Sequence, residues 1–143
     1  MGRRLRQGHA DQVLLLYALL LVAAVRLGLW LIPFRLFRRI ARRLSRPFGK
    51  LISGDPAHIV RVSKAVALAS RCVPCASCLT QAMAARILLA WHGLDADLHI
   101  GVAKKPGEKF AAHAWLTSQG YVVTGNSELG QFQPLLVMKR DRA

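Results

Sequence analysis

The hydrophobic pattern of the chain changes its period once, next to Gly93, and this change limits the fold more than any other feature. Before Gly93 apolar residues recur with helical spacing, whereas from residue 96 onward apolar and polar residues alternate as they do in strands. Turn residues at 104–108 and 118–120 divide the second part into short segments that pair as neighbouring hairpins. The sequence therefore predicts an α+β fold, with N-terminal helices followed by an antiparallel β-meander.

Two helices are expected in the N-terminal third of the chain. The first covers the apolar run 13–32 and ends at Pro33, because proline cannot continue a helix. The second covers residues 34–44, where apolar positions approximate helical spacing and arginines occupy the other face.

Residues 45–56 are rich in Gly, Ser and Pro and indicate a connector, after which two more helices are expected. Asp55 is a plausible N-cap for a helix over about 56–71, with Pro56 at its first position. Ser77 is the expected cap of a helix over about 78–91 that stops at Gly93. The expected strands cover residues 96–103, 110–117 and 121–124.

The length and composition suit one structural domain. The chain has 143 residues, of which 53% are hydrophobic, and this supports a packed core. We expect the helices of residues 1–50 to pack on a core formed by residues 51–143.

Positive charge is concentrated in the N-terminal third. The net charge is +14, and eleven of the 21 Lys and Arg residues lie in residues 1–50 against one acid, Asp11. Such a region can meet nucleic acid, anionic lipid or an acidic protein. No Gly-rich, aromatic or finger motif accompanies the arginines, so an anionic membrane surface is the expected non-protein partner and nucleic acid is not.

The apolar run 13–32 has three interpretations. It forms a helix that packs on the domain or on a partner, a helix in peripheral contact with a membrane, or a signal peptide or true span. Arg26 interrupts the run, and no small-x-small cleavage site follows it, so packing is the preferred interpretation. The expected location is cytoplasmic, with membrane association as the alternative.

Cys72, Cys75 and Cys78 are the only cysteines, and an odd, clustered set is not a disulfide framework. We interpret them as reduced thiols of a cytosolic protein. An iron–sulfur cluster would need a fourth cysteine, and zinc would need a histidine such as His92 or His99 without paired ligand spacing. Thiol–disulfide exchange through Cys72 and Cys75 is a further alternative, and no metal or cofactor is expected.

Cys78 and His113 are the candidate catalytic residues. A thiol at the start of a helix lies in the positive field of the helix N-terminus, which favours the thiolate. His113 is expected on a strand face with Ala111 and Trp115, where it can act as the base. Asn126 follows the last hairpin strand and can accept the histidine N–H, with Glu128 as the reserve choice. The other four histidines are expected to be incidental.

These residues belong to a set of short segments spread over residues 73–136. The segments are Val73-Pro74, Cys78-Leu79, Gln81-Ala82, Gly93-Leu94, Ala96, Leu98, Ile100-Gly101-Val102, Ala112-His113-Ala114-Trp115-Leu116, Gly120, Phe132 and Pro134-Leu135. As a set they resemble the leader peptidases of lasso-peptide biosynthesis, a transglutaminase-like family. The resemblance implies a transglutaminase-like or papain-like cysteine protease core, with Cys78 as nucleophile and His113 as base. The third member of the triad is usually acidic in such proteins, whereas the nearest aligned residue here is Asn126.

The resemblance also implies a substrate and partners. The expected activity removes the leader from a ribosomally made precursor peptide by thiolate attack. The chain is short and has no evident peptide-recognition domain, so a separate leader-binding protein and an ATP-dependent macrolactam cyclase are the expected partners. Backbone N–H groups at the start of the Cys78 helix are expected to form the oxyanion hole. Two alternatives stay open, namely a transglutaminase-type acyl transferase and a non-enzymatic basic module that binds metal or membrane.

Overall fold

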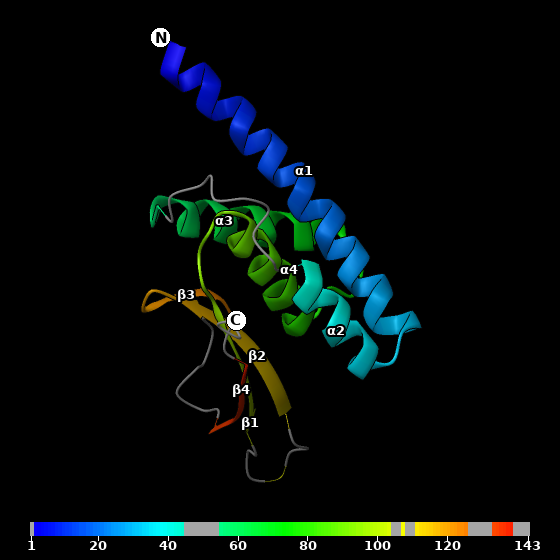
Figure 1. The fold of residues 1–143 in the computed structure, drawn as a ribbon. Coiled ribbons are helices and arrows are strands. Elements are labelled where there is room, and N and C mark those ends of the chain that lie inside the picture. The colour runs from blue at the N-terminus through cyan, green and yellow to red at the C-terminus, as the bar shows by residue number, and fades with distance from the viewer. Residues whose placement is uncertain (1, 45–54, 104–106, 108–110, 126–132, 139–143) are drawn as a thin grey trace.

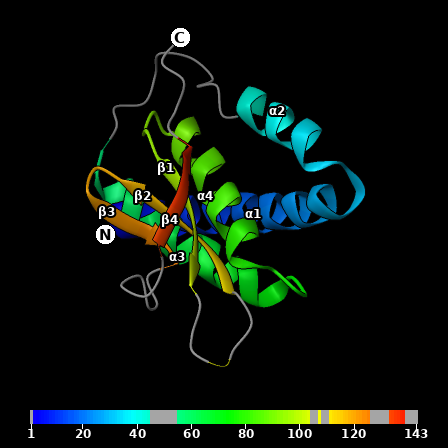
Figure 2. The ribbon, with the colours of Figure 1, turned by 90° about the horizontal axis from the view of Figure 1, so that it is seen from below.

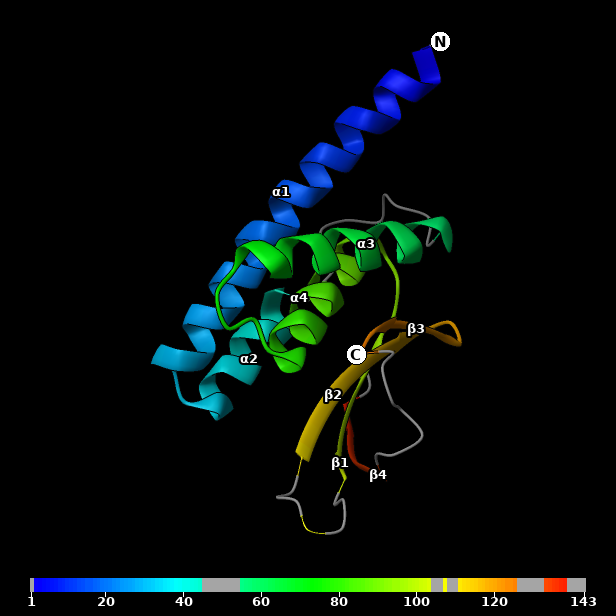
Figure 3. The same ribbon diagram turned by 180° about the vertical axis from the view of Figure 1, so that it is seen from behind.

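Three layers of secondary structure are stacked in the structure (Figure 1). The structure is a computed structural model that describes residues 2–44, 55–103, 107, 111–125 and 133–138. One outer layer is α1 (Gly2–Leu31), the middle layer holds α3 (Ala57–Cys72) and α4 (Cys78–Trp91), and a β-sheet is the other outer layer. The view from behind shows the same order (Figure 3). Helices therefore cover one face of the sheet, as expected for an α+β chain.

The sheet has four antiparallel strands in the order β3-β2-β1-β4. They are β1 (Asp97–Ala103), β2 (Ala111–Ser118), β3 (Tyr121–Thr124) and β4 (Gln133–Met138). The first three form the predicted meander, with boundaries within one residue of those expected. The sequence did not predict β4, which pairs with the far side of β1.

The hairpin between β2 and β3 has a two-residue loop. Gln119 and Gly120 both have positive φ, at 50° and 81°, and Ser118 pairs with Tyr121. Two consecutive positive φ values are those of the type I′ turn, whose twist matches that of the strands. The predicted turn at 118–120 is confirmed.

Helix α4 is buried almost all round. Thr80, Ala82, Met83, Ala84, Ala85, Ile87, Leu88, Leu89 and Ala90 are all buried. In the sequence Leu79, Met83, Ile87 and Ala90 share one helical face, which predicts an amphipathic helix with one buried face, and that prediction was wrong. The reason is the layered arrangement, since α1 and α3 pack on one side of α4 and the sheet packs on the other.

The end of α4 follows the sequence prediction. Gly93 has a φ of +72°, its N–H donates to the carbonyl of Ala90, and the N–H of Leu94 donates to the carbonyl of Leu89. This pair of hydrogen bonds is the Schellman motif, which needs a left-handed residue just after the helix.

The start of α3 also agrees with the sequence. Asp55 Oδ1 accepts a hydrogen bond of 3.0 Å from the N–H of Ala57, and the Asp55 carbonyl accepts one from His58. Pro56 directly precedes the helix with φ of −55° and ψ of −24°, and its missing N–H costs nothing there. The helix begins at Ala57, one residue later than expected.

Helix α1 is longer than predicted and packs on α3 and α4. Its buried residues are Leu14, Ala18, Leu21, Val22 and Val25. Asp11 accepts a 2.8 Å hydrogen bond from Nε of Arg61 and so ties α1 to α3. Among the described helices, α1 alone is long and apolar enough over residues 8–31 to cross a membrane, a test that core helices and signal sequences also pass.

Helix α2 (Phe34–Leu44) stands to the side of the layers (Figure 2). It has the boundaries that the sequence predicted. The ring of Phe37, on α2, lies over Gly28 of α1. A Cβ at position 28 would come within 2.8 Å of that ring. At the other end, the Leu44 carbonyl accepts a 2.7 Å hydrogen bond from the indole of Trp91. Glycine at position 28 therefore allows α2 to approach α1.

Candidate active site

Ser77 sets the position of Cys78 at the start of α4. Ser77 has extended backbone angles, and its Oγ accepts a 3.3 Å hydrogen bond from the N–H of Thr80. The hydroxyls of Ser77 and Thr80 lie 3.0 Å apart and also share a hydrogen bond. The predicted cap is confirmed, and it places Cys78 in the first turn, where backbone N–H groups have no partner within the helix.

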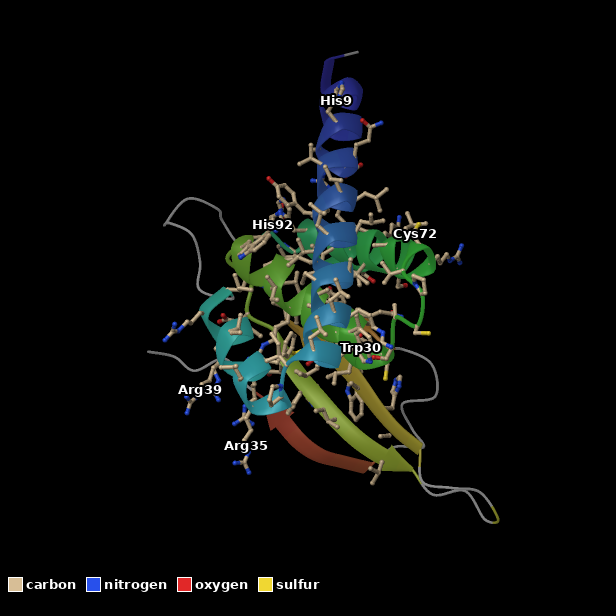
Figure 4. The ribbon with its side chains drawn as sticks, turned by 90° about the vertical axis from the view of Figure 1, so that its right-hand side faces the viewer. His9, Trp30, Arg35, Arg39, Cys72 and His92 are labelled. Atoms are coloured by element: carbon tan, nitrogen blue, oxygen red, sulfur yellow. The ribbon has the colours of Figure 1, made fainter. Side chains whose placement is uncertain are left out.

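The thiol of Cys78 lies against β2. The N–H of Ala114, the residue after His113, donates to Cys78 Sγ at 3.4 Å. Cys78 is half-buried, while Cys72 and Cys75 are exposed. The structure thus brings Cys78 to the backbone of the strand that carries His113, and it leaves the other two thiols outside. Cys72 lies at the edge of the molecule, at the end of α3 (Figure 4).

A backbone carbonyl orients His113. Nε2 of His113 lies 3.0 Å from the carbonyl oxygen of Gly125. A carbonyl only accepts, so Nε2 carries the proton in this contact and Nδ1 is the basic nitrogen of the neutral ring. The sequence predicted a side-chain acceptor for His113 and did not predict this backbone carbonyl.

Gly125 can approach His113 because it has no side chain. A Cβ at this position would lie 2.8 Å from the Ala114 carbonyl oxygen, 2.8 Å from the Trp115 Cβ and 3.0 Å from His113 Nε2. Its φ of +78° is also in the left-handed region that favours glycine. A glycine directly after a predicted strand was the available signal for such a close approach.

Aromatic rings extend from His113 along the sheet. His113 stacks on Trp115 with a centroid distance of 6.1 Å, and Trp115 stacks on His99 at 5.3 Å. Nε2 of His99 lies 2.9 Å from Thr117 Oγ1. The predicted common face of His113 and Trp115 is confirmed. His99, which the sequence predicted to be incidental, stacks on Trp115 because β1 and β2 pair these two positions directly.

Asn126 and Glu128, the predicted third members of the site, lie outside the described residues. Their roles stay predictions.

Among the residues that the structure does describe, no three His, Cys, Asp or Glu side chains are grouped as metal ligands. His58 and His92 lie with ring centroids 4.8 Å apart, and His9 is on the exposed N-terminal part of α1 (Figure 4).

A half-buried thiol at a helix N-terminus, held against the strand of an oriented histidine, is the arrangement that thiol enzymes use. The model of the family described as "Transglutaminase-like superfamily" matches residues 19–137, which is more than half of the chain. The protein belongs to this superfamily, which includes cysteine peptidases and acyl transferases. Comparisons of the chain with curated proteins and with solved structures gave no match.

Proposed function

We propose that the protein is a cysteine peptidase that removes the leader from a ribosomally synthesised lasso-peptide precursor. The observation that carries the peptidase proposal is the contact between Cys78 Sγ and the N–H of Ala114, which places the thiol beside the strand of His113. The substrate class rests on the resemblance of the segments around Cys78 and His113 to the leader peptidases. The same resemblance supports a separate leader-binding protein and an ATP-dependent cyclase as partners.

The proposed reaction has two steps. Nδ1 of His113 first takes the proton of the Cys78 thiol, and the thiolate attacks the carbonyl carbon of the scissile peptide bond. The C–N bond then breaks as His113 gives that proton to the leaving amine. Water then attacks the thioester, His113 takes the water proton, and the leader leaves with a new carboxylate while the thiol is restored. In this scheme Nδ1 of His113 exchanges the protons, because Nε2 is directed at Gly125.

The oxyanion of each step needs hydrogen-bond donors. Backbone N–H groups in the first turn of α4 point toward the N-terminal end of the helix, where Cys78 lies. Donors of this kind stabilise a developing negative charge most when they are fixed in advance. The Ser77 cap fixes that turn.

Substitution of the three cysteines, one at a time, tests the nucleophile. We expect Cys78→Ala to abolish leader cleavage while the protein stays folded, and Cys72→Ser and Cys75→Ser to retain most of the activity, since both of those thiols are exposed. His113→Ala should lower turnover by a factor of about 10²–10⁴, because proton transfer is lost. The measurement is mass spectrometry of a precursor peptide with the leader-binding protein present. Equal loss in all three cysteine variants would instead point to a metal or redox site.

Acyl transfer is the second candidate, because the same superfamily contains acyl transferases. The thioester on Cys78 would then pass its acyl group to an amine in place of water. A primary amine added to the cleavage assay separates the two activities. Peptidase activity predicts a free carboxylate on the leader, whereas transferase activity predicts an amide of the added amine.

A further inference from the structure

The outer face of α1 is apolar and uncovered, although a helix that is apolar all round is normally buried on every side. We define this outer face by six exposed residues: Val13, Leu16, Leu20, Leu27, Trp30 and Leu31. Trp30 is 74% exposed and Leu31 is 69% exposed. Only 22% of the most apolar stretch of α1 is buried in the fold.

These six residues form one continuous stripe. At 3.6 residues per turn they fall within an arc of about 100° of the helix, and they extend for about 27 Å along its axis. The buried residues of α1, from Leu14 to Val25, lie on the opposite side of the helix and pack on α3 and α4. A contiguous apolar stripe of this size on a folded protein marks an interaction site.

Arginines flank the stripe. Arg26 lies on α1, and α2 carries Arg35, Arg38, Arg39, Arg42 and Arg43 on the face opposite its apolar residues. In a view onto α1, Arg35 and Arg39 project sideways from α2, beside the end of α1 that bears Trp30 (Figure 4). Residues 1–50 contain one acid, Asp11, and that acid is paired with Arg61.

We propose that the outer face of α1, with α2 beside it, docks the protein on the surface of an anionic membrane. Apolar side chains enter the interface, Trp30 lies at headgroup depth, and the arginines meet lipid phosphates. A second copy of the chain fits this surface poorly, since two such faces would bring the arginines of both copies together. The proposal goes beyond the peptidase activity and does not depend on it.

The packing of α1 favours an orientation in the plane of the membrane. A transmembrane α1 would have to pull Leu14, Ala18 and Val22 away from the core and break the contact between Asp11 and Arg61. An in-plane α1 keeps all of these contacts and buries only the outer face.

Vesicle flotation of the 143-residue protein tests the proposal. We expect binding to phosphatidylcholine vesicles that contain phosphatidylglycerol, little binding to phosphatidylcholine alone, and weaker binding as salt increases, since charge attraction is screened within about 10 Å at 0.1 M. The triple variant Leu16→Gln, Leu20→Gln, Leu27→Gln should weaken binding by about tenfold or more, because it removes apolar burial. The matched control is Val60→Gln, Leu68→Gln on α3, which changes residues of similar exposure and should bind as the unaltered protein does.

A charge-reversed set tests the arginines separately. Arg38→Glu, Arg39→Glu, Arg42→Glu and Arg43→Glu together should abolish the preference for anionic vesicles and leave Cys78 alkylation unchanged. Circular dichroism confirms that each variant is folded. Unaltered binding by the outer-face variant, no binding of the unaltered protein at low salt, or a dimer or protein complex that covers the outer face would overturn the proposal. Resistance of the bound protein to alkaline carbonate extraction would overturn the in-plane orientation.

Discussion

Gly125 is in direct contact with His113 and helps to set the orientation of its ring. Its carbonyl holds Nε2 of His113, and its missing side chain permits the approach. Gly120 offers a natural comparison, because it has nearly the same φ, +81° against +78°, with no atom near the position of a Cβ.

We therefore predict different outcomes for Gly125→Ala and Gly120→Ala. Both variants lose about 1 kcal/mol from the left-handed backbone. Gly125→Ala should lose about 1–3 kcal/mol more from overpacking and should also displace His113. Thermal unfolding measures the first effect, and the alkylation rate of Cys78 together with turnover measures the second. Equal stability and equal turnover in the two variants would contradict the role of the Gly125 carbonyl.

The sequence predicted the places of Cys78 at a helix start and of His113 on a strand, but not how the histidine is held. A helix-start cysteine and a strand histidine follow from local patterns, and the shared face of His113 and Trp115 follows from strand alternation. A hydrogen bond to a backbone carbonyl leaves no such pattern, because every residue has a carbonyl. The contact of His99 with Trp115 could not be predicted for a similar reason, because it depends on the register of two strands.

At the scale of elements, helix ends were predicted better than helix environments. Asp55, Ser77 and Gly93 act through their nearest neighbours in the sequence, so the boundaries of α3 and α4 could be predicted within a residue. The burial of α4 depends on α1, which is distant in the sequence. The spacing of apolar residues within α4 therefore could not predict it. Strand β4 was missed because Pro134 argues against a strand, yet β4 lies at the sheet edge, where proline is tolerated.

The cap of α4 can be tested by Ser77→Ala. The variant loses the hydrogen bond to the Thr80 N–H and leaves the buried Thr80 hydroxyl without that partner. We expect a loss of about 1–2 kcal/mol, which lowers Tm by about 3–6 °C at this chain length. Turnover should fall as well, because the first turn of α4 carries Cys78. Ser70→Ala is the control, since the Ser70 hydroxyl donates to the Ala67 carbonyl of its own helix in an exposed hydrogen bond. An equal drop of Tm in both variants would show that the Ser77 cap contributes no more to stability than the Ser70 hydroxyl does.

At the scale of the whole molecule, the proposed function assigns leader recognition to a separate protein. All described strands belong to the one sheet that carries His113. We predict slow or undetectable cleavage of the precursor by this protein alone and rescue by a small leader-binding protein. Cleavage rates with and without the partner, with Cys78→Ala as the blank, measure the dependence. Efficient cleavage by the isolated chain would refute it.

The burial of α4 affects whether the candidate active site unfolds locally or together with the whole fold. A helix on the surface can fray or detach while the rest of a protein stays native, and its amide protons then exchange with solvent through local opening. Helix α4 contacts α1, α3 and the sheet together, so we expect its hydrogen-bonded amides beyond the first turn to exchange only when all three layers separate. We therefore expect Cys78 to adjoin a slowly exchanging part of the fold, and mild heat or denaturant should inactivate the protein in the same cooperative transition that unfolds it.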